Sequence, residues 1–223
     1  MYYFGEIEIP SVSSIRDLGI TISGNFKFHE HIQNIVSTAS KTCNMIHRCF
    51  TFKSKTFLMD MFKSFARPQL EYASQVWNPL YLGDIKLIES VQRRYTKGIP
   101  GLYDHTYGQR LQSLEIDTLE FRRLKQDLIF AFKLIRGYLN VDYKNFFKIK
   151  VSQTRGHQFT IIKEKFKKDV RKHFFTIRVV NAWNSLPADA VNAPNLIVFK
   201  KWLSTDSARE RLKPFLRGEA FEV

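Results

Sequence analysis

The chain has 223 residues, of which 44% are hydrophobic, and it carries a formal net charge of +14. This hydrophobic content is enough for a folded core and excludes a globally disordered chain. The apolar runs are far shorter than the roughly 20 residues of a membrane-spanning helix, and the N-terminus lacks the pattern of a signal peptide. We therefore expect an intracellular protein, nuclear or cytoplasmic, that is not secreted.

The first 140 residues predict short strands followed by helices. Residues 3–9 and 15–22 are typical of strands, and Ser23-Gly24-Asn25 ends the second one as a turn. Apolar residues then recur at helical spacing, with Thr118 as an N-cap and Gly98 and Gly137 as stops. The predicted helices span residues 29–50, 54–67, 84–97, 107–114 and 118–136.

Beyond residue 140 the periodicity weakens. We expect a strand near residues 158–163 and helices near 174–186 and 194–203. The fold class is therefore mostly α, with a short β edge before a helical bundle and a smaller mixed α/β region at the C-terminus. The predicted boundaries are residues 1–24 for the sheet edge, 25–140 for the helical domain, 141–204 for the basic C-terminal region and 205–223 for a flexible tail.

The two cysteines predict a reduced, metal-free protein. Cys43 and Cys49 lie six residues apart on one predicted helix, about 240° around it, so they cannot bridge each other. His47 lies four residues after Cys43, but a zinc site needs ligands that converge from at least two segments. We expect core packing for both cysteines.

The sequence contains no recognisable active site. Its 21 acidic residues include neither Asp-Asp nor Asp-x-Asp, and Asp104-His105 is interpreted as a loop cap. Gly-x-Ser-x-Gly, phosphate-loop and dinucleotide-binding motifs are absent. We expect this chain by itself to be neither an enzyme nor the holder of a cofactor.

The segment 148–178 predicts a polyanionic partner. It has ten Lys or Arg residues against Glu164 and Asp169, interleaved with Phe and His rings. Dense positive charge with flat rings suits a phosphate backbone and stacked bases. An anionic membrane is the alternative, but we find no basic amphipathic helix with a lipid-facing side. RNA, DNA or both are therefore the expected partners, without a membrane.

A second cationic group lies on the predicted helix 84–97. Arg93 and Lys97 are four residues apart and hence neighbours on that helix, where they could contact a nucleic-acid backbone. The alternative is a solvated helix face with no partner. The candidate nucleic-acid-binding residues are Arg93, Arg94, Lys97, Arg155, His157, Lys163, Lys165, Lys167, Lys168, Arg171, Lys172 and Arg178.

Three aromatic residues beside these cations are expected to pack instead of stacking on bases. Trp183 shares an apolar stripe with Val179 and Val180, and Phe174 and Phe175 precede that stripe. Arg171 and Arg178 lie outside it and are the better contact candidates.

Seven ordered motifs resemble one family, the reverse transcriptases of jockey-like non-LTR retrotransposons (LINE elements). The resemblance covers about residues 12–203 and concerns the C-terminal part of those proteins. The motifs are Arg16–Ile20, Phe26–Ile32, Ser64–Pro79, Ile88–Lys97, Leu119–Leu124, Thr154–His157 and Phe174–Pro187.

The resemblance implies a parent RNA-directed DNA polymerase that uses Mg²⁺. Its catalytic aspartates would sit in a Tyr/Phe-Ala-Asp-Asp motif before Met1, so this chain would have no polymerase activity alone. Residues 1–24 would be the last palm strands and residues 25–140 a thumb-like helical domain. Arg93, Arg94 and Lys97 would then grip a primer–template duplex, and segment 148–178 would hold element RNA or target DNA.

Two alternatives stay open. The exposed sheet edge and Phe-rich helices could make the chain a protein-interaction module, with the missing palm and fingers or a full-length polymerase as its partner. The chain could also be a truncated retroelement copy without a function.

Overall fold

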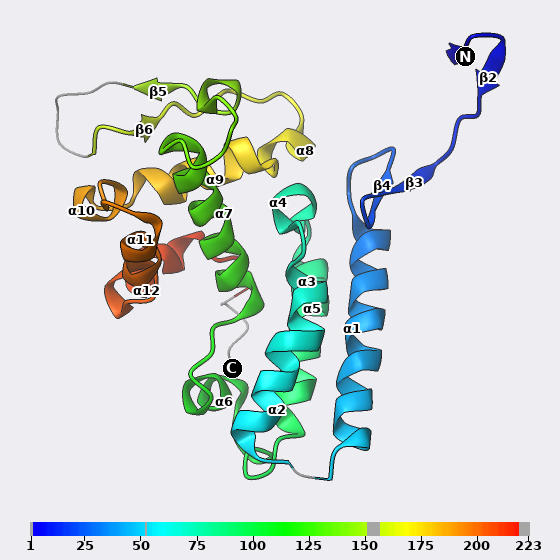
Figure 1. The fold of residues 1–223 in the computed structure, drawn as a ribbon, viewed down its shortest axis with the longest axis vertical. Coiled ribbons are helices and arrows are strands. Elements are labelled where there is room, and N and C mark those ends of the chain that lie inside the picture. The colour runs from blue at the N-terminus through cyan, green and yellow to red at the C-terminus, as the bar shows by residue number, and fades with distance from the viewer. Residues whose placement is uncertain (1, 52, 151–156, 219–223) are drawn as a thin grey trace.

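A computed structural model describes residues 2–51, 53–150 and 157–218 of the chain. The described residues form a mostly α-helical body, in which strands occur only as three separate two-stranded antiparallel sheets. Figure 1 shows the helices in two groups side by side, with the N-terminal strands projecting from one flank. The predicted fold class, mostly α with a short β edge and a mixed C-terminal region, is confirmed.

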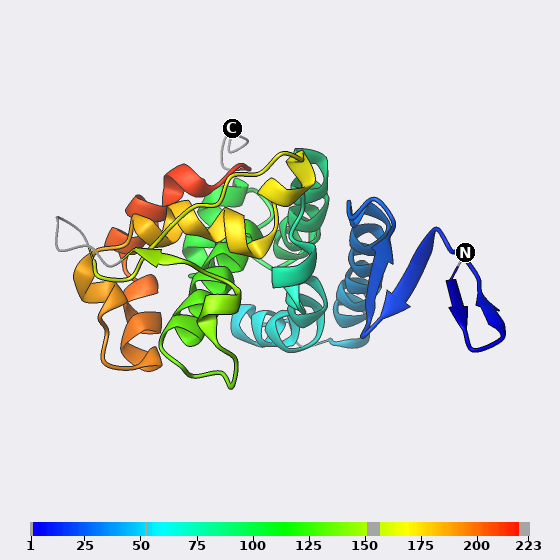
Figure 2. The same cartoon turned by 90° about the horizontal axis from the view of Figure 1, so that it is seen from above.

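The N-terminal strands form two hairpins where the sequence predicted two strands. Strand β1 (Tyr2–Phe4) pairs with β2 (Ile7–Ile9), and β3 (Ser14–Asp17) pairs with β4 (Ile20–Ser23). Each predicted strand is interrupted by a glycine at positive φ, Gly5 at 63° and Gly19 at 83°. Glycine adopts this turn conformation without steric cost, so the chain reverses there. The first hairpin projects from the helical body (Figures 1 and 2).

The first helical group contains six α-helices. These are α1 (His29–Cys49), α2 (Lys55–Met61), α3 (Arg67–Glu71), α4 (Ser74–Trp77), α5 (Leu82–Lys97) and α6 (Tyr107–Ser113). A π-helical turn over Phe62–Ala66 joins α2 to α3, with the Arg67 amide bonded to the Phe62 carbonyl. Pro68 has no N–H to continue the regular pattern, which accounts for the change of helix type.

The core of this group is built from the predicted apolar stripes. Ile32, Ala39 and Ile46 on α1 are buried in a core to which α5, the π-helical turn and α3 also contribute. The Tyr95 hydroxyl donates to the Leu58 carbonyl at 2.6 Å. Cys43 is 5% exposed, which confirms its place in the core, and this burial raises the pKa of its thiol to about 12. Cys49 is exposed, so the prediction that it packs in the core is wrong. It is the last residue of α1, beyond the buried stripe.

The second helical group surrounds another core. Its α-helices are α7 (Leu119–Ile135), α8 (Asp169–Lys172), α9 (Phe175–Asn184), α10 (Ala188–Val191), α11 (Leu196–Leu203) and α12 (Asp206–Leu212). Strands β5 (Ile149–Lys150) and β6 (Thr160–Ile161) form its hairpin, and 3₁₀ turns cover Tyr143–Asn145 and Lys213–Phe215. Trp183 is fully buried there, as predicted, and donates from Nε1 to the Phe159 carbonyl at 2.9 Å.

The division between the two cores differs from the predicted boundary at residue 140. Leu119 belongs to the first core and Phe121 to the second, so most of α7 packs with the C-terminal half. The rings of Phe132 on α7 and Phe199 on α11 stack with centroids 4.3 Å apart. The prediction of an apolar stripe on α7 is confirmed, but the sequence did not show which of the two cores this stripe faces.

The structure also corrects the flexible tail predicted for residues 205–223. Thr205 caps α12, and Ala208 and Leu212, four residues apart, are fully buried. Farther along, the Glu120 carboxylate accepts the backbone amides of Arg217 at 2.8 Å and Gly218 at 2.7 Å. The last five residues, 219–223, lie outside the described part. The two buried residues on one face of α12 and the Glu120 bonds together hold this segment against the second core.

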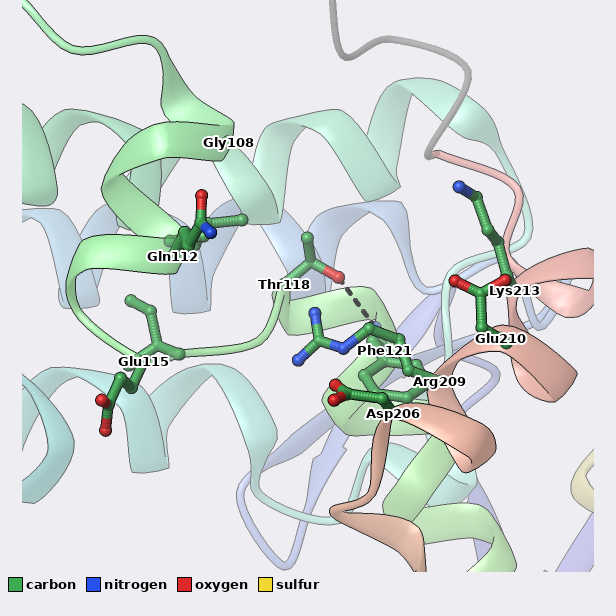
Figure 3. Close-up of a pocket in the computed structure, with 11 residues that line it drawn as sticks. Gly108, Gln112, Glu115, Thr118, Phe121, Asp206, Arg209, Glu210 and Lys213 are labelled. Carbon is green, nitrogen blue, oxygen red and sulfur yellow. Dashed lines mark hydrogen bonds between the residues drawn. The ribbon is translucent and has the colours of Figure 1, made fainter.

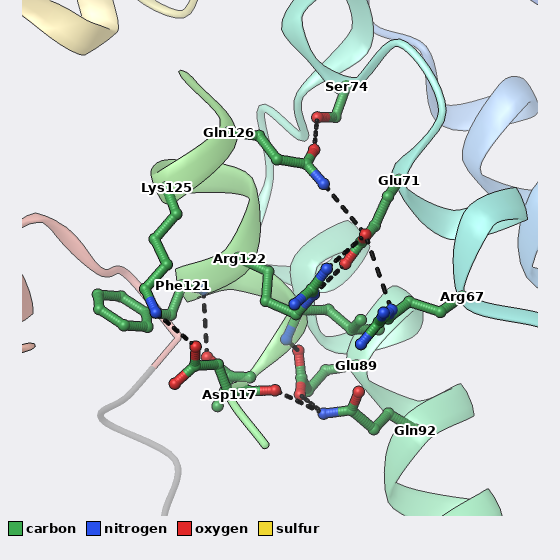
Figure 4. A network of polar contacts seen from close by, with 12 residues as sticks. Arg67, Glu71, Ser74, Glu89, Gln92, Asp117, Phe121, Arg122, Lys125 and Gln126 are labelled. Atoms are coloured by element: carbon green, nitrogen blue, oxygen red, sulfur yellow. Dashed lines mark hydrogen bonds and ion pairs between the residues drawn. The ribbon is translucent and has the colours of Figure 1, made fainter. Parts of the chain in front are cut away.

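A polar network joins the two halves (Figure 4). Glu71 on α3 accepts from Arg122 on α7, with the Nη2–Oε2 distance at 2.9 Å, and from the Gln126 amide at 3.0 Å. The Glu89 carboxylate accepts the Leu119 amide at the first residue of α7 at 2.9 Å. These bonds fix the start of α7 against α3 and α5.

Arg178 forms the second connection between the halves. Its guanidinium donates to both Asp127 carboxylate oxygens at 2.8 Å, to the His173 carbonyl at 2.8 Å and to the Gln75 carbonyl at 3.1 Å. It therefore joins α9 to α7 and α4. Both side chains are almost fully buried.

We predict that Arg178→Met lowers the free energy of unfolding by about 3–5 kcal/mol, because it leaves the Asp127 charge buried and unpaired. The double variant Arg178→Met/Asp127→Leu should recover much of that loss, since neither charge of this pair is then left buried without the other. Urea denaturation of both variants and the wild type measures the difference. Equal stability of Arg178→Met and the wild type would contradict the prediction.

Candidate nucleic-acid interface

Several lysines of the predicted basic segment lie at the surface of the second helical group. Lys163, Lys165, Lys167, Lys168 and Lys172 are all exposed. Lys163 Nζ lies 3.3 Å from Asn181 Oδ1. The other four form no ion pair with any side chain that the structure describes. They present uncompensated positive charge to solvent, as a phosphate-binding surface requires.

Arg171 is exposed but has local contacts. Its Nη2 lies 3.8 Å from Glu164 Oε2, and the other Glu164 oxygen lies 3.1 Å from Lys148 Nζ. Its guanidinium carbon is 5.2 Å from the centre of the Phe174 ring. Because these ion pairs are exposed, they stabilise the fold little and leave Arg171 free to contact a phosphate.

Two exposed aromatic rings stand beside Arg171. Phe174 is 38% exposed, and its ring centroid lies 6.4 Å from that of Phe26, which is 50% exposed. The prediction that Phe174 packs in the core is therefore wrong, whereas Phe175 and Trp183 are buried as predicted. Phe174 precedes the first turn of α9, so its side chain falls outside the buried stripe. We call Phe26, Lys168, Arg171, Lys172 and Phe174 the cationic–aromatic surface.

Two predicted contact residues are engaged by partners within the fold instead of lying on this cationic surface. Arg178 is committed to Asp127 and backbone carbonyls. His157 is only 4% exposed, and its Nε2 lies 3.3 Å from the Trp183 carbonyl. Both predictions are wrong, because each side chain is held by partners within the fold, His157 by the Trp183 carbonyl and Arg178 by Asp127 and the Gln75 carbonyl. Arg155 lies outside the described residues.

Arg93, Arg94 and Lys97 form a separate patch. They are exposed on the last turns of α5, where Arg93 lies 4.5 Å from the Tyr107 ring centre and Lys97 5.1 Å from that of Tyr103. Arg94 donates to the Ser90 carbonyl and the Ser40 hydroxyl, each at 3.3 Å. This end of α5 leads to α6, at the opposite end of the body from α8 (Figure 1). The structure therefore divides the predicted cations into two patches.

A hollow of about 500 Å³ between α6 and α12 carries no comparable chemistry (Figure 3). Its lining mixes the acidic residues Glu115, Asp206 and Glu210 with Arg209 and Lys213. Arg209 is already paired with Asp117. With three acidic and two basic side chains in its lining, this hollow does not extend the cationic surface.

The described residues show neither a metal-binding cluster nor a membrane-spanning helix. They contain no group of three or more His, Cys, Asp or Glu side chains placed to hold a metal ion. No helix in the described ranges is long and apolar enough to cross a membrane.

The sequence analysis did not single out two residues, Phe26 and Arg123, that the structure places at the candidate sites. Phe26 precedes α1 and meets Phe174 only through folding, and no local signal links residues 148 positions apart. Arg123 on α7 is 2% exposed, and none of its guanidinium nitrogens has a hydrogen-bond partner among the described residues. Burial lowers the pKa of this guanidinium, while Glu89 and Glu120 oppose the shift. Helical periodicity places Arg123 beside Asp127 but does not reveal that Asp127 is bonded to Arg178 instead.

Comparison with known proteins shows a similarity to a nematode sequence. An uncharacterized protein of Caenorhabditis elegans is 24% identical over 132 residues, which are 58% of this chain and 63% of that protein. The chain thus spans under two thirds of that relative's length. No protein-family model and no solved structure matches the chain.

We predict that His157 makes stability depend on pH. Burial lowers its pKa in the folded state, so the unfolded chain takes up a proton first as the pH falls through about 6.5. This contribution to stability is present above that pH and is lost below it. The stability advantage of the wild type over His157→Gln should therefore shrink between pH 8 and pH 5. Urea denaturation across this range tests it, and parallel pH profiles would refute it.

Proposed function

We propose that this chain is a nucleic-acid-binding portion of the RNA-directed DNA polymerase of a jockey-like non-LTR retrotransposon. It grips element RNA, target DNA or a primer–template and leaves polymerisation, with its Mg²⁺, to the palm of the parent enzyme. The cationic–aromatic surface is the observation that carries this proposal. The seven ordered sequence motifs supply the choice of family.

The chemistry of this surface favours backbone and stacking contacts over reading of sequence. Lys168 and Lys172 can neutralise phosphates, which releases condensed counterions and makes binding depend on salt. Phe26 and Phe174 offer ring faces for unpaired bases, with Arg171 against one of them. We therefore expect single strands or strand ends to bind there in preference to a continuous duplex.

The Arg93–Lys97 patch has a different role in this proposal. Its three cations lie on one helix, and among the described residues no pair of neighbouring exposed rings like Phe26 and Phe174 accompanies them. Such a patch suits the phosphates of a duplex, which is consistent with a thumb-like helix. A long nucleic acid could contact both patches at once, one at each end of the helical body.

A protein-interaction module is the second candidate, favoured by the N-terminal hairpins. Ile7, on the projecting first hairpin, is 72% exposed, and Leu18, in the turn between β3 and β4, is 81% exposed. Unpaired strand edges with exposed apolar residues invite another chain to pair with them. The partner would be the palm and fingers or a full-length polymerase.

We predict that Lys165→Gln/Lys167→Gln weakens single-strand binding and lowers the slope of log K against log salt by about 1–1.4, because each lost phosphate contact removes about 0.7. Filter binding of a single-stranded oligonucleotide at four salt concentrations measures this slope.

The matched control is Lys200→Gln/Lys201→Gln. These two exposed lysines lie on α11, across the body from α8, so the same charge is lost elsewhere. Equal slopes for the two double variants would show that Lys165 and Lys167 act only through the net charge of the protein and not through contacts with phosphates. Binding that does not change with salt would refute the proposed function.

We also predict a contribution from ring stacking. Phe174→Ala should weaken single-strand binding by about 1–3 kcal/mol, the usual value for one base on one aromatic ring, and affect duplex binding little. Phe174→Tyr keeps a ring and should bind like the wild type. Fluorescence anisotropy with matched single-stranded and duplex probes separates the two cases. An equal loss on both probes would argue against stacking.

A further inference from the structure

We infer that the hollow between α7, α9 and residues 214–217 binds a phosphomonoester, the phosphate of a nucleotide that is either free or at the end of a strand. The hollow has a volume of about 400 Å³, within the range of small-ligand sites. This inference deepens the proposed function, and its strand-end form rests on it.

The walls come from segments far apart in the sequence. One face of α7 supplies Glu120, Arg123 and Asp127, spaced three and four residues apart. Helix α9 adds Arg178 and Asn181, and the chain after α12 adds Arg217 along with apolar residues. Lys163 and Lys172, both exposed, line the solvent side.

Both carboxylates of the hollow are already occupied. Asp127 accepts two bonds from Arg178, and Glu120 accepts the amides of Arg217 and Gly218. Five cationic side chains face these two carboxylates, so the hollow keeps a positive excess. A phosphomonoester, with a charge between −1.5 and −2 near neutral pH, matches this excess better than a single carboxylate does.

Arg123 is the strongest indication of a ligand. Its guanidinium is buried, yet its three nitrogens have no hydrogen-bond partner among the described residues. Buried polar groups in native proteins are nearly always bonded, and an exception calls for an explanation. Guanidinium groups match phosphate oxygens through paired N–H donors. A phosphate in the hollow would supply the missing acceptors.

The apolar part of the wall indicates what the phosphate is attached to. Ile85, Leu124, Ile177 and Phe215 line the same hollow. Inorganic phosphate would leave these residues without contacts, whereas a nucleoside could pack on them. A nucleotide therefore fits both the charged and the apolar surfaces.

The test compares a ten-nucleotide single strand carrying a 5′-phosphate with the same strand carrying a 5′-hydroxyl, using the full chain. The phosphorylated strand should bind about tenfold more tightly, as a net gain of charged hydrogen bonds implies. AMP should raise the melting temperature of the wild type, and inorganic phosphate should do so less. If AMP raises the melting temperature, the site also takes free nucleotides. If only the strand shows a preference for the 5′-phosphate, the site takes strand ends alone.

Arg123→Met keeps the side-chain length and removes the charge. It should abolish the phosphate preference and the AMP effect, while Lys200→Gln/Lys201→Gln should retain both. If Arg123→Met fails to fold, as judged by circular dichroism, the surface variant Lys163→Gln/Lys172→Gln tests the inference instead. The affinity for the 5′-phosphate strand relative to the 5′-hydroxyl strand must then be lower in this variant than in the wild type.

The inference is overturned if neither AMP nor the 5′-phosphate has an effect, or if the preference survives in the folded variants. The proposed function fails separately. If the 5′-hydroxyl strand binds and the 5′-phosphate adds nothing, only the inference about the hollow is wrong. If AMP binds but neither strand does, only the proposed nucleic-acid-binding function is wrong.

Discussion

The arrangement of the two halves depends on the Arg178 guanidinium. Arg178 donates to Asp127 on α7, to the Gln75 carbonyl on α4 and to the His173 carbonyl just before α9. An arginine is suited to this because its planar group offers five donors in fixed directions. Burial raises the pKa of the Asp127 carboxyl, and Arg178 opposes that shift, so each charge makes the burial of the other tolerable.

This connection also determines where the residues of the proposed binding surface lie. It holds the junction of α8 and α9 against the first half, and there Phe174 meets Phe26 beside Arg171. A surface that needs rings from one segment and cations from another exists only if both halves are fixed. The Glu71–Arg122 pair and the Glu89 bond to the start of α7 stabilise the same relation from the other end of that helix.

The cationic–aromatic surface and the hollow divide the proposed binding into a general and a specific part. Exposed lysines attract any phosphate backbone and are screened by salt. Arg123 is buried and therefore acts in a low dielectric, where a charge discriminates between a phosphate and a hydroxyl. Because Asp127 is neutralised by Arg178, the interaction that joins the halves also keeps the hollow positive.

The sequence alone determined the local features. The helix stripe through Ile32 and Ile46, the Thr118 cap and the burial of Trp183 follow from short-range periodicity and capping, which act within a few residues. Only the tertiary structure decided which cations stay free. The partner of Arg178 is 51 residues away, and Phe174 is exposed beside Phe26 instead of packed. Sequence composition fixes how much positive charge the chain has, but long-range contacts select the side chains that neutralise it.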